Sequence, residues 1–474
     1  LGHAQASVAG KGVRRMSVFS LSNLKKTWYY LQKNGIRNAV WAVLERIGQE
    51  QEVYTWQEPD EKTLSFQREH SASLRISIVV PAYRTKKEHL EAMLNSVSKQ
   101  SYPHWELIVA DAGGTAESVQ AWAKKNGICL RKAADTSNLA EWKDQSIMLC
   151  TLSENKGISA NTNAGIELAA GDAVGLLDHD DLLTANALWE MADCLEKEKK
   201  RGKQKLVLFS DEDKCDGAAS RFSEPNFKPD FDGELLLTNN YICHFTVIET
   251  VFLKELKLRS GFDGAQDYDL VLRAYAAGGQ FVHVPKVLYH WRCHEASTAS
   301  NPQSKRYAYE AGQRALEDYC LRKGWKATVS GLKHLGFYRE DYEDSVFCQR
   351  PEIGIWAKPL PGGRDIFGIR HPKGFLVSGL YENDGLMRYA GLRKGYSGPM
   401  HRAALQQSAP AADLRSMEVC SALKERYAQT IAELKEACQG LPTAAQETKI
   451  LQKSMEFCKE ATAAGYGILW DPQA

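Results

Sequence analysis

Between residues 75 and 330 the chain alternates short apolar runs with segments of helical spacing. The runs RISIVVPAY (75–83), HWELIVADAGG (104–114) and AVGLLDHDD (173–181) end in turn-forming or charged residues. Such runs predict buried strands, whereas KEHLEAMLNSVSKQ (87–100) has the spacing of an amphipathic helix. Because helices separate the strands, we predict a parallel sheet whose ligands bind beyond the carboxyl ends of the strands.

The pattern continues to about residue 330. We expect further strands at IMLCTLSEN, KLVLFSDEDK, YICHFTVIE and QFVHVPKVLYHWR, and further helices at 159–171, 185–200, 266–279 and 309–324. Alternating strands and helices of this kind are typical of an α/β domain. We place that domain at residues 73–335.

The two flanking regions have other patterns. Residues 22–48 have the spacing of two amphipathic helices, aromatic on one face and basic on the other, and 51–72 are polar enough for a linker. We therefore expect residues 1–72 to be a helical extension packed on the main domain, with membrane-surface contact as the alternative. A Gly- and Pro-rich stretch at 351–399 precedes long helical segments, so we expect 336–474 to be a separate, mixed but mostly helical region.

Composition adds few constraints. Of the 474 residues, 43% are hydrophobic and 25% are charged, which is ordinary for a globular protein of two or three domains. The 60 basic and 59 acidic residues give a net charge of +1, so we expect no nucleic-acid partner. Eleven cysteines without a C-x-x-C pair predict reduced thiols. Since no apolar run approaches the ~18 residues of a membrane span and the first residues lack a signal peptide's apolar centre, we expect a cytoplasmic protein.

The strand at 173–181 ends in Asp178, His179, Asp180 and Asp181. At the carboxyl end of a parallel strand, the D-x-D pair lies where a ligand is expected. Carboxylates of this kind suit Mg²⁺ or Mn²⁺, which bind through one or two carboxylates together with substrate phosphates. A solvated loop is the alternative, and we expect Asp181 to begin the following helix.

A second candidate group is Asp267, in the segment SGFDGAQDYDLVLRAYAAGG. Apolar residues of one helical face follow it, so Asp267 falls in the first turn of the predicted helix, where the helix dipole favours an ionised carboxylate. Such a carboxylate can accept a proton from an incoming hydroxyl. Simple helix capping is the alternative.

Taken together, these blocks resemble a family 2 glycosyltransferase with the GT-A fold, a Rossmann-like arrangement that binds nucleotide-diphospho-sugars. The resemblance rests on ISIVVPAY, SYPHWELIVADAG, ENKGISANTNAGIELAAGDAVGLLDHDDLL, SDEDK, FKPDF and GAQDYDLVLRA with HVPKVLYHWRCHEAST. It covers residues 74–330 and is greatest with bacterial enzymes that build O-antigen, rhamnose-containing or other cell-surface polysaccharides.

The resemblance implies a role for each matching position. Pro81 and Tyr83 would flank the nucleotide base, with Tyr83 as the stacking face. Asp180 would bind the metal, Asp178 would lie toward the ribose, and Asp267 would be the catalytic base. In HWRCH, Arg292 and His294 would approach the diphosphate and the metal, although packing and surface hydrogen bonding are the alternative for both.

Two positions depart from the family pattern. Asp111 matches a nucleotide-binding position, but Ala112 stands where a second acidic residue often pairs with the base, so UDP-sugars and dTDP-sugars are equally consistent donors. Gln266 replaces the usual Glu before the catalytic Asp. The carboxyl-terminal region faintly resembles part of a second, degenerate or truncated glycosyltransferase-like domain, in which Glu456 takes the acidic-Asp position; a helical closing domain is the alternative.

Three further groups leave alternatives open. Lys156 and Asn163 lie on a loop-to-helix turn that could face the nucleotide, but a helix cap by Ser159 is equally supported. The acidic run at 211–213 could border the acceptor, although a solvated turn is favoured. A zinc site at 290–294 is disfavoured because no second ligand pair has suitable spacing.

We therefore predict an inverting, metal-dependent glycosyltransferase that acts on a glycan or lipid-linked glycan, with peripheral contact to the inner face of the plasma membrane as a further hypothesis. The chemistry is consistent, because a divalent cation stabilises a nucleoside-diphosphate leaving group. A non-catalytic nucleotide-sugar or glycan-binding scaffold is the alternative. A nucleotidyltransferase is disfavoured because PAYRTKKE, not a Gly-rich basic loop, follows the first strand.

Overall fold

The fold is described here from a computed structural model. The described residues are 54–135, 143–293, 306–331, 336–343, 345–357, 417–437, 453, 456–457, 460–461 and 463–470. The helical pair expected at 22–48, His294 and the segment GLYENDGLMRYAG lie outside them.

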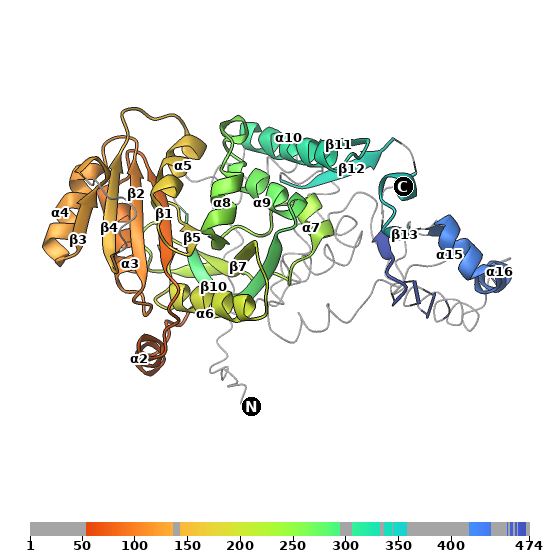
Figure 1. Cartoon of the computed structure of the whole chain (residues 1–474), viewed down its shortest axis with the longest axis horizontal. Coiled ribbons are helices and arrows are strands. Elements are labelled where there is room, and N and C mark those ends of the chain that lie inside the picture. The colour runs from red at the N-terminus through yellow and green to blue at the C-terminus, as the bar shows by residue number, and fades with distance from the viewer. Residues whose placement is uncertain are drawn as a thin grey trace, which may run out of the picture.

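One large sheet forms the centre of the main domain (Figure 1). Its strands follow the order β3-β4-β2-β1-β5-β9-β7-β10-β6, and β8 pairs with β7. The strands are β1 (Ile76–Ala82), β2 (Trp105–Asp111), β3 (Cys129–Lys132), β4 (Ser146–Thr151), β5 (Ala173–Leu176), β6 (Leu182–Leu183), β7 (Leu206–Cys215), β8 (Phe222–Asn226), β9 (Thr246–Glu249) and β10 (Gln280–Arg292).

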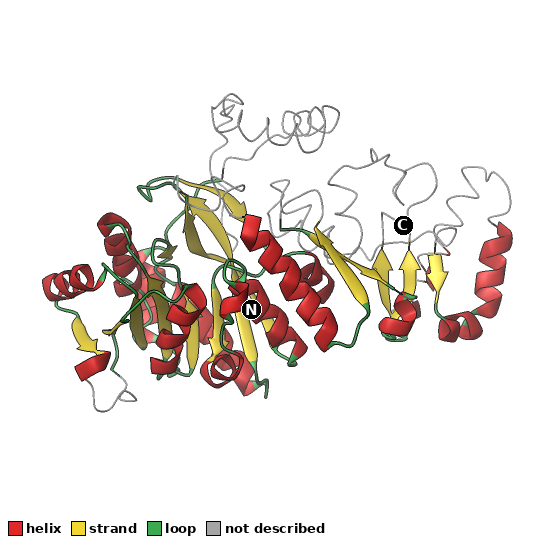
Figure 2. Ribbon diagram, turned by 90° about the horizontal axis from the view of Figure 1, so that it is seen from above, coloured by secondary structure: helices red, strands yellow, loops and turns green. Residues whose placement is uncertain are grey.

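Helices cover both faces of this sheet (Figure 2). The helices of this part of the chain are α2 (Glu61–Glu69), α3 (Lys87–Ser98), α4 (Ala116–Asn126), α5 (Ile158–Leu168), α6 (Ala187–Lys200), α7 (Gly233–Thr238), α8 (Thr250–Leu256), α9 (Gln266–Ala276) and α10 (Arg306–Arg322). Apolar residues of α3, α4 and α6 pack on one face, and those of α5, α8 and α9 pack on the other. The predicted α/β class is confirmed.

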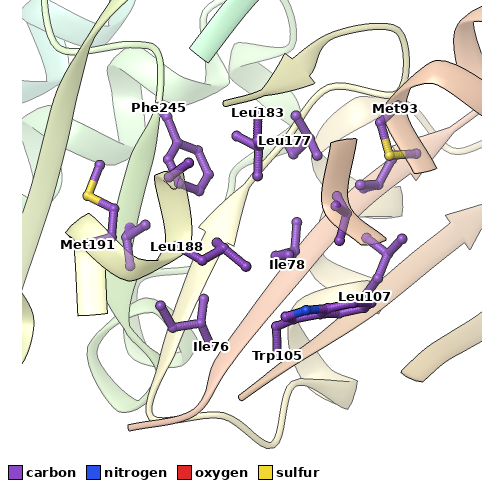
Figure 3. Close-up of a cluster of buried hydrophobic side chains, with 14 of the residues drawn as sticks. Ile76, Ile78, Met93, Trp105, Leu107, Leu177, Leu183, Leu188, Met191 and Phe245 are labelled. Atoms are coloured by element: carbon purple, nitrogen blue, oxygen red, sulfur yellow. The ribbon is translucent and has the colours of Figure 1, made fainter. Parts of the chain in front are cut away.

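The alternation of side chains along β1 explains how both faces acquire a core. Ile76 and Ile78 belong to the cluster shown in Figure 3, whereas Val79 belongs to the cluster on the opposite face. Both faces of a central strand are buried, so its sequence is a continuous apolar run instead of an alternating one. Burial on both faces therefore holds β1, which leads to the candidate site, in place.

The sheet is mixed, and the expectation of a fully parallel sheet is wrong. β1 is parallel to β2 and β5, and β7 is parallel to β10, but β9 runs antiparallel between β5 and β7. β9 is also shorter than the predicted strand, beginning at Thr246. A continuous apolar run indicates a buried strand but does not indicate its direction.

The segment expected to be a linker is partly structured. α2 begins after Asp60, whose side chain accepts a hydrogen bond from Thr63 N–H at 2.7 Å and caps the helix. On its inner face, Gln67 donates to Glu190 at 3.3 Å. The polar composition of this segment therefore reflects one exposed helix face, because the other face packs on α6.

The predicted boundary between residues 335 and 336 falls inside a hairpin. β11 (Ala327–Gly331) pairs antiparallel with β12 (Tyr338–Tyr342), and buried Phe337 and Tyr338 join the core around α9 and α10. The main domain therefore extends past the predicted boundary, because strand pairing joins the two sides.

Beyond the hairpin, the described residues form a separate three-stranded sheet (Figures 1 and 2). Its central strand β13 (Ile353–Ala357) is antiparallel to β14 (Met417–Val419) and parallel to β15 (Gly467–Trp470), with α11 (Val346–Gln349), α15 (Ser421–Arg426) and α16 (Ala428–Ala437) nearby in sequence. Within the described residues, no helix combines the length and apolar character needed to cross a membrane.

Candidate active site at the carboxyl edge of the sheet

Four segments that are distant in the sequence meet at the carboxyl edge of the sheet. Asp178 and Asp180 follow β5, and His244 lies just before β9, whose first residue pairs with the last residue of β5. Asp267 lies in the first turn of α9, and Arg292 ends β10. The charges of His244, Asp180 and Asp267 all act on the Asp178 carboxyl, so these groups share one electrostatic environment.

The loop at residues 178–181, called the D-x-D loop below, is fastened to β10. Tyr289 Oη donates a hydrogen bond to Asp181 Oδ2 at 2.6 Å and accepts one from Asp178 N–H at 3.4 Å. Arg292 N–H donates to Asp181 Oδ1 at 2.7 Å. These contacts leave Asp178 and Asp180 half-buried, within reach of a ligand.

The expectation that Asp181 begins the next helix is wrong. Its side chain is buried, and both carboxylate oxygens accept hydrogen bonds from β10. The following residues form the short strand β6, and α6 begins only at Ala187. Asp181 therefore fixes the D-x-D loop instead of capping a helix, which the sequence could not indicate because its partners lie more than 100 residues away.

Arg292 is buried beneath the D-x-D loop. Its Nε donates to the carbonyl oxygen of Asp180 at 2.5 Å, and its Nη1 donates to the carbonyl oxygen of Gly217 at 2.7 Å. Nη2 is buried and has no hydrogen-bond partner among the described residues. Arg292 thus positions the loop, while its predicted contact with a diphosphate stays a prediction.

The D-x-D loop holds more negative charge than its surroundings favour. Burial raises the pKa of Asp178, and the Asp180 carboxylate raises it further, against the opposing effect of His244. Burial also raises the pKa of Asp181 well above its ordinary value, an effect that the neighbouring carboxylates strengthen. Both shifts mean that an added positive charge stabilises the loop.

One positive charge already belongs to the chain. The Glu212 Oε2 atom accepts hydrogen bonds from His244 N–H at 2.5 Å and from its Nδ1 at 3.2 Å. Lys228 Nζ lies 4.0 Å from the same oxygen, and Asn226 Nδ2 donates to Glu212 Oε1 at 3.2 Å. Burial disfavours the His244 cation, but the hydrogen bond and charge of Glu212 outweigh it and raise the His244 pKa to about 9.

The acidic run at residues 211–213 is not the solvated turn that we favoured. Asp211, Glu212 and Asp213 are all buried in β7. His283 Nε2 lies 2.8 Å from Asp211 Oδ1, and His290 Nδ1 lies 2.5 Å from Asp213 Oδ1. Each acid therefore has a basic partner on a neighbouring segment, and sequence composition alone cannot reveal such pairing.

Asp267 is oriented by Asn240, a residue that no sequence pattern singled out. Asn240 Nδ2 donates to Asp267 Oδ2 at 2.9 Å. Next to them, burial and then the Asp267 charge raise the pKa of the Cys243 thiol well above its ordinary value. Gln266 accepts a hydrogen bond from Gly264 N–H at 2.8 Å, a contact that a Glu side chain would also make.

A buried ion-pair cluster anchors α9 beneath Asp267. Asp269, in the same helical turn, accepts hydrogen bonds from Arg259 Nε at 3.1 Å and Arg273 Nε at 2.9 Å. Arg259 also bonds Asp318 of α10 at 2.8 Å. This cluster holds the start of α9 against η2 (Ser260–Phe262) and α10, and so fixes where Asp267 lies.

The residues present fit a divalent cation that is shared with a phosphate. Asp178 and Asp180 offer carboxylate oxygens, the type of ligand that Mg²⁺ and Mn²⁺ prefer. Among the described residues, no group of three or more His, Cys, Asp or Glu side chains is arranged to hold a metal ion. Since Mg²⁺ sites often use one or two carboxylates plus substrate phosphates, this arrangement suits an ion that enters with the nucleotide.

The base-binding end predicted at β1 has one exposed aromatic ring. Tyr83 is 38% exposed, and its ring lies beside Gly113 of the loop after β2. The two loops are joined by a 3.0 Å hydrogen bond from Arg84 N–H to the carbonyl oxygen of Gly113. Pro81 pairs with Ala110 inside the sheet. The Arg84 guanidinium lies 5.0 Å from the centre of the Tyr83 ring, and the predicted stacking of Tyr83 on the nucleotide base stays a prediction.

Asp111 does not present its carboxylate to a ligand. It is buried, and its oxygens accept hydrogen bonds from the N–H groups of Gly113 at 3.0 Å, Thr115 at 3.2 Å and Ala116 at 2.9 Å. The predicted nucleotide contact is corrected accordingly. Asp111 shapes the loop and the start of α4, because its oxygens satisfy amides that have no partner inside the helix.

Asn163 is likewise structural, which corrects its predicted place at the nucleotide. Its Nδ2 donates to the Leu258 carbonyl oxygen at 2.8 Å, and its Oδ1 accepts from Leu258 N–H at 2.9 Å. Lys156 is exposed and lies 3.1 Å from Glu154, so its predicted role stays a prediction.

The start of α5 is capped from a distant segment. Asp263 Oδ1 accepts hydrogen bonds from Ser159 N–H at 3.2 Å and from Ser159 Oγ at 2.5 Å. Gly157 has a φ of +96°, and a Cβ there would overlap the Asp263 carboxylate. The Asp263 carboxylate therefore already occupies the amino end of α5. The sequence pattern did not indicate this contact because Asp263 is 104 residues from Ser159.

This architecture defines an α/β domain with a carboxylate-lined edge, and known proteins contain similar domains. The profile of Glycosyl transferase family 2 matches residues 77–255. This part of the chain is therefore similar to a family 2 glycosyltransferase domain, in line with the resemblance.

Relatives share this domain. The uncharacterized protein y4gI of Sinorhizobium fredii is 36% identical over 255 residues, which are 53% of this chain and 26% of that protein. The O-antigen biosynthesis protein RfbC of Myxococcus xanthus is 34% identical over 54% of this chain and 19% of its own length. The amylovoran biosynthesis glycosyltransferase AmsB of Erwinia amylovora is 28% identical, over 46% of this chain and 70% of its own.

The chain spans about a quarter or less of the first two of these relatives. Among solved structures, S. aureus TarS 1–349 in complex with UDP-GlcNAc is similar with a TM-score of 0.40 and 15% identity, covering 84% of this chain and 94% of that one.

Proposed function

We propose that this protein is a metal-dependent, inverting glycosyltransferase that moves a sugar from a nucleotide-diphosphate donor to a growing cell-surface glycan. The observation that supports this most is the convergence of Asp178 and Asp180, at the end of β5, with Asp267, at the start of α9, in one electrostatic environment. The match of residues 77–255 to the Glycosyl transferase family 2 profile supports the reaction class.

In the proposed reaction, Asp267 accepts the proton of an acceptor hydroxyl while that oxygen attacks the anomeric carbon. The bond between the anomeric carbon and the donor's phosphate oxygen breaks as the new glycosidic bond forms, so the configuration inverts. The electron pair leaves with the nucleoside diphosphate. A Mg²⁺ or Mn²⁺ ion held at Asp180 would stabilise the negative charge of that leaving group.

The proposed division of the site follows the sheet. We assign Tyr83 to the nucleotide base, Asp178 to the ribose, Arg292 to the diphosphate and His294, which lies outside the described residues, to the metal. Family relatives named for O-antigen and amylovoran biosynthesis support a cell-surface glycan as the acceptor. Peripheral contact with the plasma membrane is proposed from the basic, aromatic pattern of residues 22–48.

The test is a donor panel. Purified full-length protein is incubated with UDP- and dTDP-sugars and Mn²⁺ or Mg²⁺, and release of nucleoside diphosphate is measured with and without EDTA. We expect release from at least one donor, its loss in EDTA, and a fall of about 10²-fold or more in both Asp180→Asn and Asp267→Asn. Asp193→Asn, which changes an exposed ion pair on α6, is the matched control with unchanged activity.

Full activity in either site variant would overturn the site assignment. Donor binding without turnover across the whole panel would instead support the scaffold function. If activity is retained in EDTA, the reaction does not depend on a metal ion. The carboxylates of Asp178 and Asp180 would then need another cation to balance their charge.

A further inference from the structure

His244 is held rigidly at the D-x-D loop, yet the proposed reaction gives it no role. Its backbone N–H and its Nδ1 both bond the same oxygen of Glu212. Its ring stacks on Tyr289 at a centroid distance of 4.9 Å and an angle of 17°. Since Tyr289 also bonds the D-x-D loop, the imidazole and the loop share a single support.

The groups around His244 are mostly anionic. Glu212 contacts it directly, and the charges of Asp178 and Asp181 both act on it. The opposing cation is Lys228, which is buried, lies 4.0 Å from Glu212, and donates to the carbonyl oxygens of Ile242 at 2.8 Å and His244 at 2.5 Å. The surroundings therefore favour a positively charged imidazole in the folded protein.

One nitrogen of this imidazole remains available. Glu212 takes Nδ1, and Nε2 has no hydrogen-bond partner among the residues that the structure describes. The His244 side chain is 27% exposed although its neighbours Glu212 and Lys228 are almost fully buried. This imidazole therefore carries an N–H without a partner among the described residues, and its charge acts on Asp178 of the D-x-D loop.

We propose that His244 is a phosphate-binding residue of the donor site and that its fixed charge keeps a divalent cation from binding firmly until the diphosphate arrives. This inference rests on the proposed function for the identity of the anion. The imidazolium attracts the phosphate oxygens and repels a free metal ion. Arrival of the diphosphate adds negative charge beside both carboxylates, so the metal ion then binds without a net penalty.

Replacing His244 by glutamine tests both effects, because the amide can still bond Glu212 but carries no charge. Binding of Mn²⁺ alone is measured by electron paramagnetic resonance, and binding of UDP and dTDP is measured by calorimetry in EDTA. We expect the dissociation constant for Mn²⁺ to fall about tenfold and that for the diphosphates to rise about tenfold, the order of effect that one unit charge has near a charged ligand. His104→Gln, which changes an exposed histidine paired with Asp144, is the matched control.

The opposite directions of the two shifts separate this role from damage to the fold, which would weaken both. His244→Lys, which restores a positive charge, should recover part of the diphosphate affinity. The inference is overturned if Mn²⁺ binds His244→Gln no more tightly than wild type, if the diphosphate affinity is unchanged, or if wild type binds no diphosphate in EDTA. Neither measurement involves sugar transfer, so a protein that shows both shifts but uses no donor would refute the proposed function alone.

Discussion

Replacing Asp269 by asparagine removes one negative charge from the centre of a buried arginine cluster. Asp269 is 1% exposed, and it bonds both Arg259 and Arg273. Arg273 is 8% exposed, and its other donors bond the carbonyl oxygens of Leu256 and Lys257. In the variant, the Asn amide group would face a guanidinium group that has lost its carboxylate.

The expected size follows from this burial. Breaking a buried ion pair by removing one partner costs about 3–5 kcal/mol, whereas an exposed i,i+4 pair contributes about 0.3–0.5 kcal/mol. Asp193→Asn is the control for an exposed i,i+4 pair, because the Asp193 and Lys197 side chains are 30% and 63% exposed. Asp318→Asn should lie between them, since Asp318 is more exposed than Asp269 and shares Arg259 with it.

Urea unfolding followed by circular dichroism measures this series. At an m-value of about 3 kcal/mol/M, a loss of about 3 kcal/mol lowers the midpoint by about 1 M. Sugar-donor turnover should also fall in Asp269→Asn at temperatures where it stays folded, because the start of α9 carries Asp267. If the free energies of unfolding of Asp269→Asn and Asp193→Asn agree within about 0.5 kcal/mol, the cluster does not anchor α9.

Three other changes have equally specific outcomes. Gly157→Ala should lower the free energy of unfolding by about 1–3 kcal/mol, measured in urea, because its φ is +96° and its Cβ would displace Asp263. Asn240→Ala should lower kcat about tenfold with little change in the donor KM, since it releases the candidate base, as initial rates would show. Folding raises the pKa of His244 from 6.5 to about 9, so the stability that this group contributes is lost as the pH rises through that range. Folding lowers the pKa of Glu212 from 4.5 to about 2, so its contribution is lost as the pH falls through that range. Both contributions are complete between about pH 4.5 and 6.5.

Each of these has a result that would contradict it. Gly157→Ala with wild-type stability would mean that the loop relaxes without disturbing the cap of α5. If Asn240→Ala changes only the donor KM, then Asn240 contributes to donor binding and does not orient Asp267. For the pH dependence, raising the pH from 6.5 to 9 should lower the urea midpoint of His244→Gln less than that of the wild type. Equal decreases in the two proteins would show that another group titrates in this pH range.

Much of the fold could be predicted because its strands are buried on both faces. The continuous apolar runs of β1, β2 and β7 located the strands, and the charge that follows β5 predicted the candidate site. The pattern also placed Asp267 correctly in the first turn of α9. What it could not give was the direction of β9, because an apolar run looks the same in both directions.

The partners of charged residues were beyond the reach of the sequence for a related reason. Asp111 and Asn163 are polar residues next to predicted turns, and nothing in their spacing separates a ligand contact from a bond to the backbone. His244 lies inside a segment that was expected to be strand only, and its partner Glu212 is 32 residues earlier. Only the folded arrangement brings this pair beside the D-x-D loop.

The reversed direction of β9 determines which loop brings residues to the candidate site. A parallel strand delivers residues to this edge only after the chain has completed it, so changing them risks the helix that follows. Because β9 runs the other way, the loop at 239–245 reaches the site before its strand begins, and it contributes Asn240, Cys243 and His244. Substitutions in this loop can therefore alter the surroundings of Asp178 and Asp267 while β5, β7 and their carboxylates stay in place.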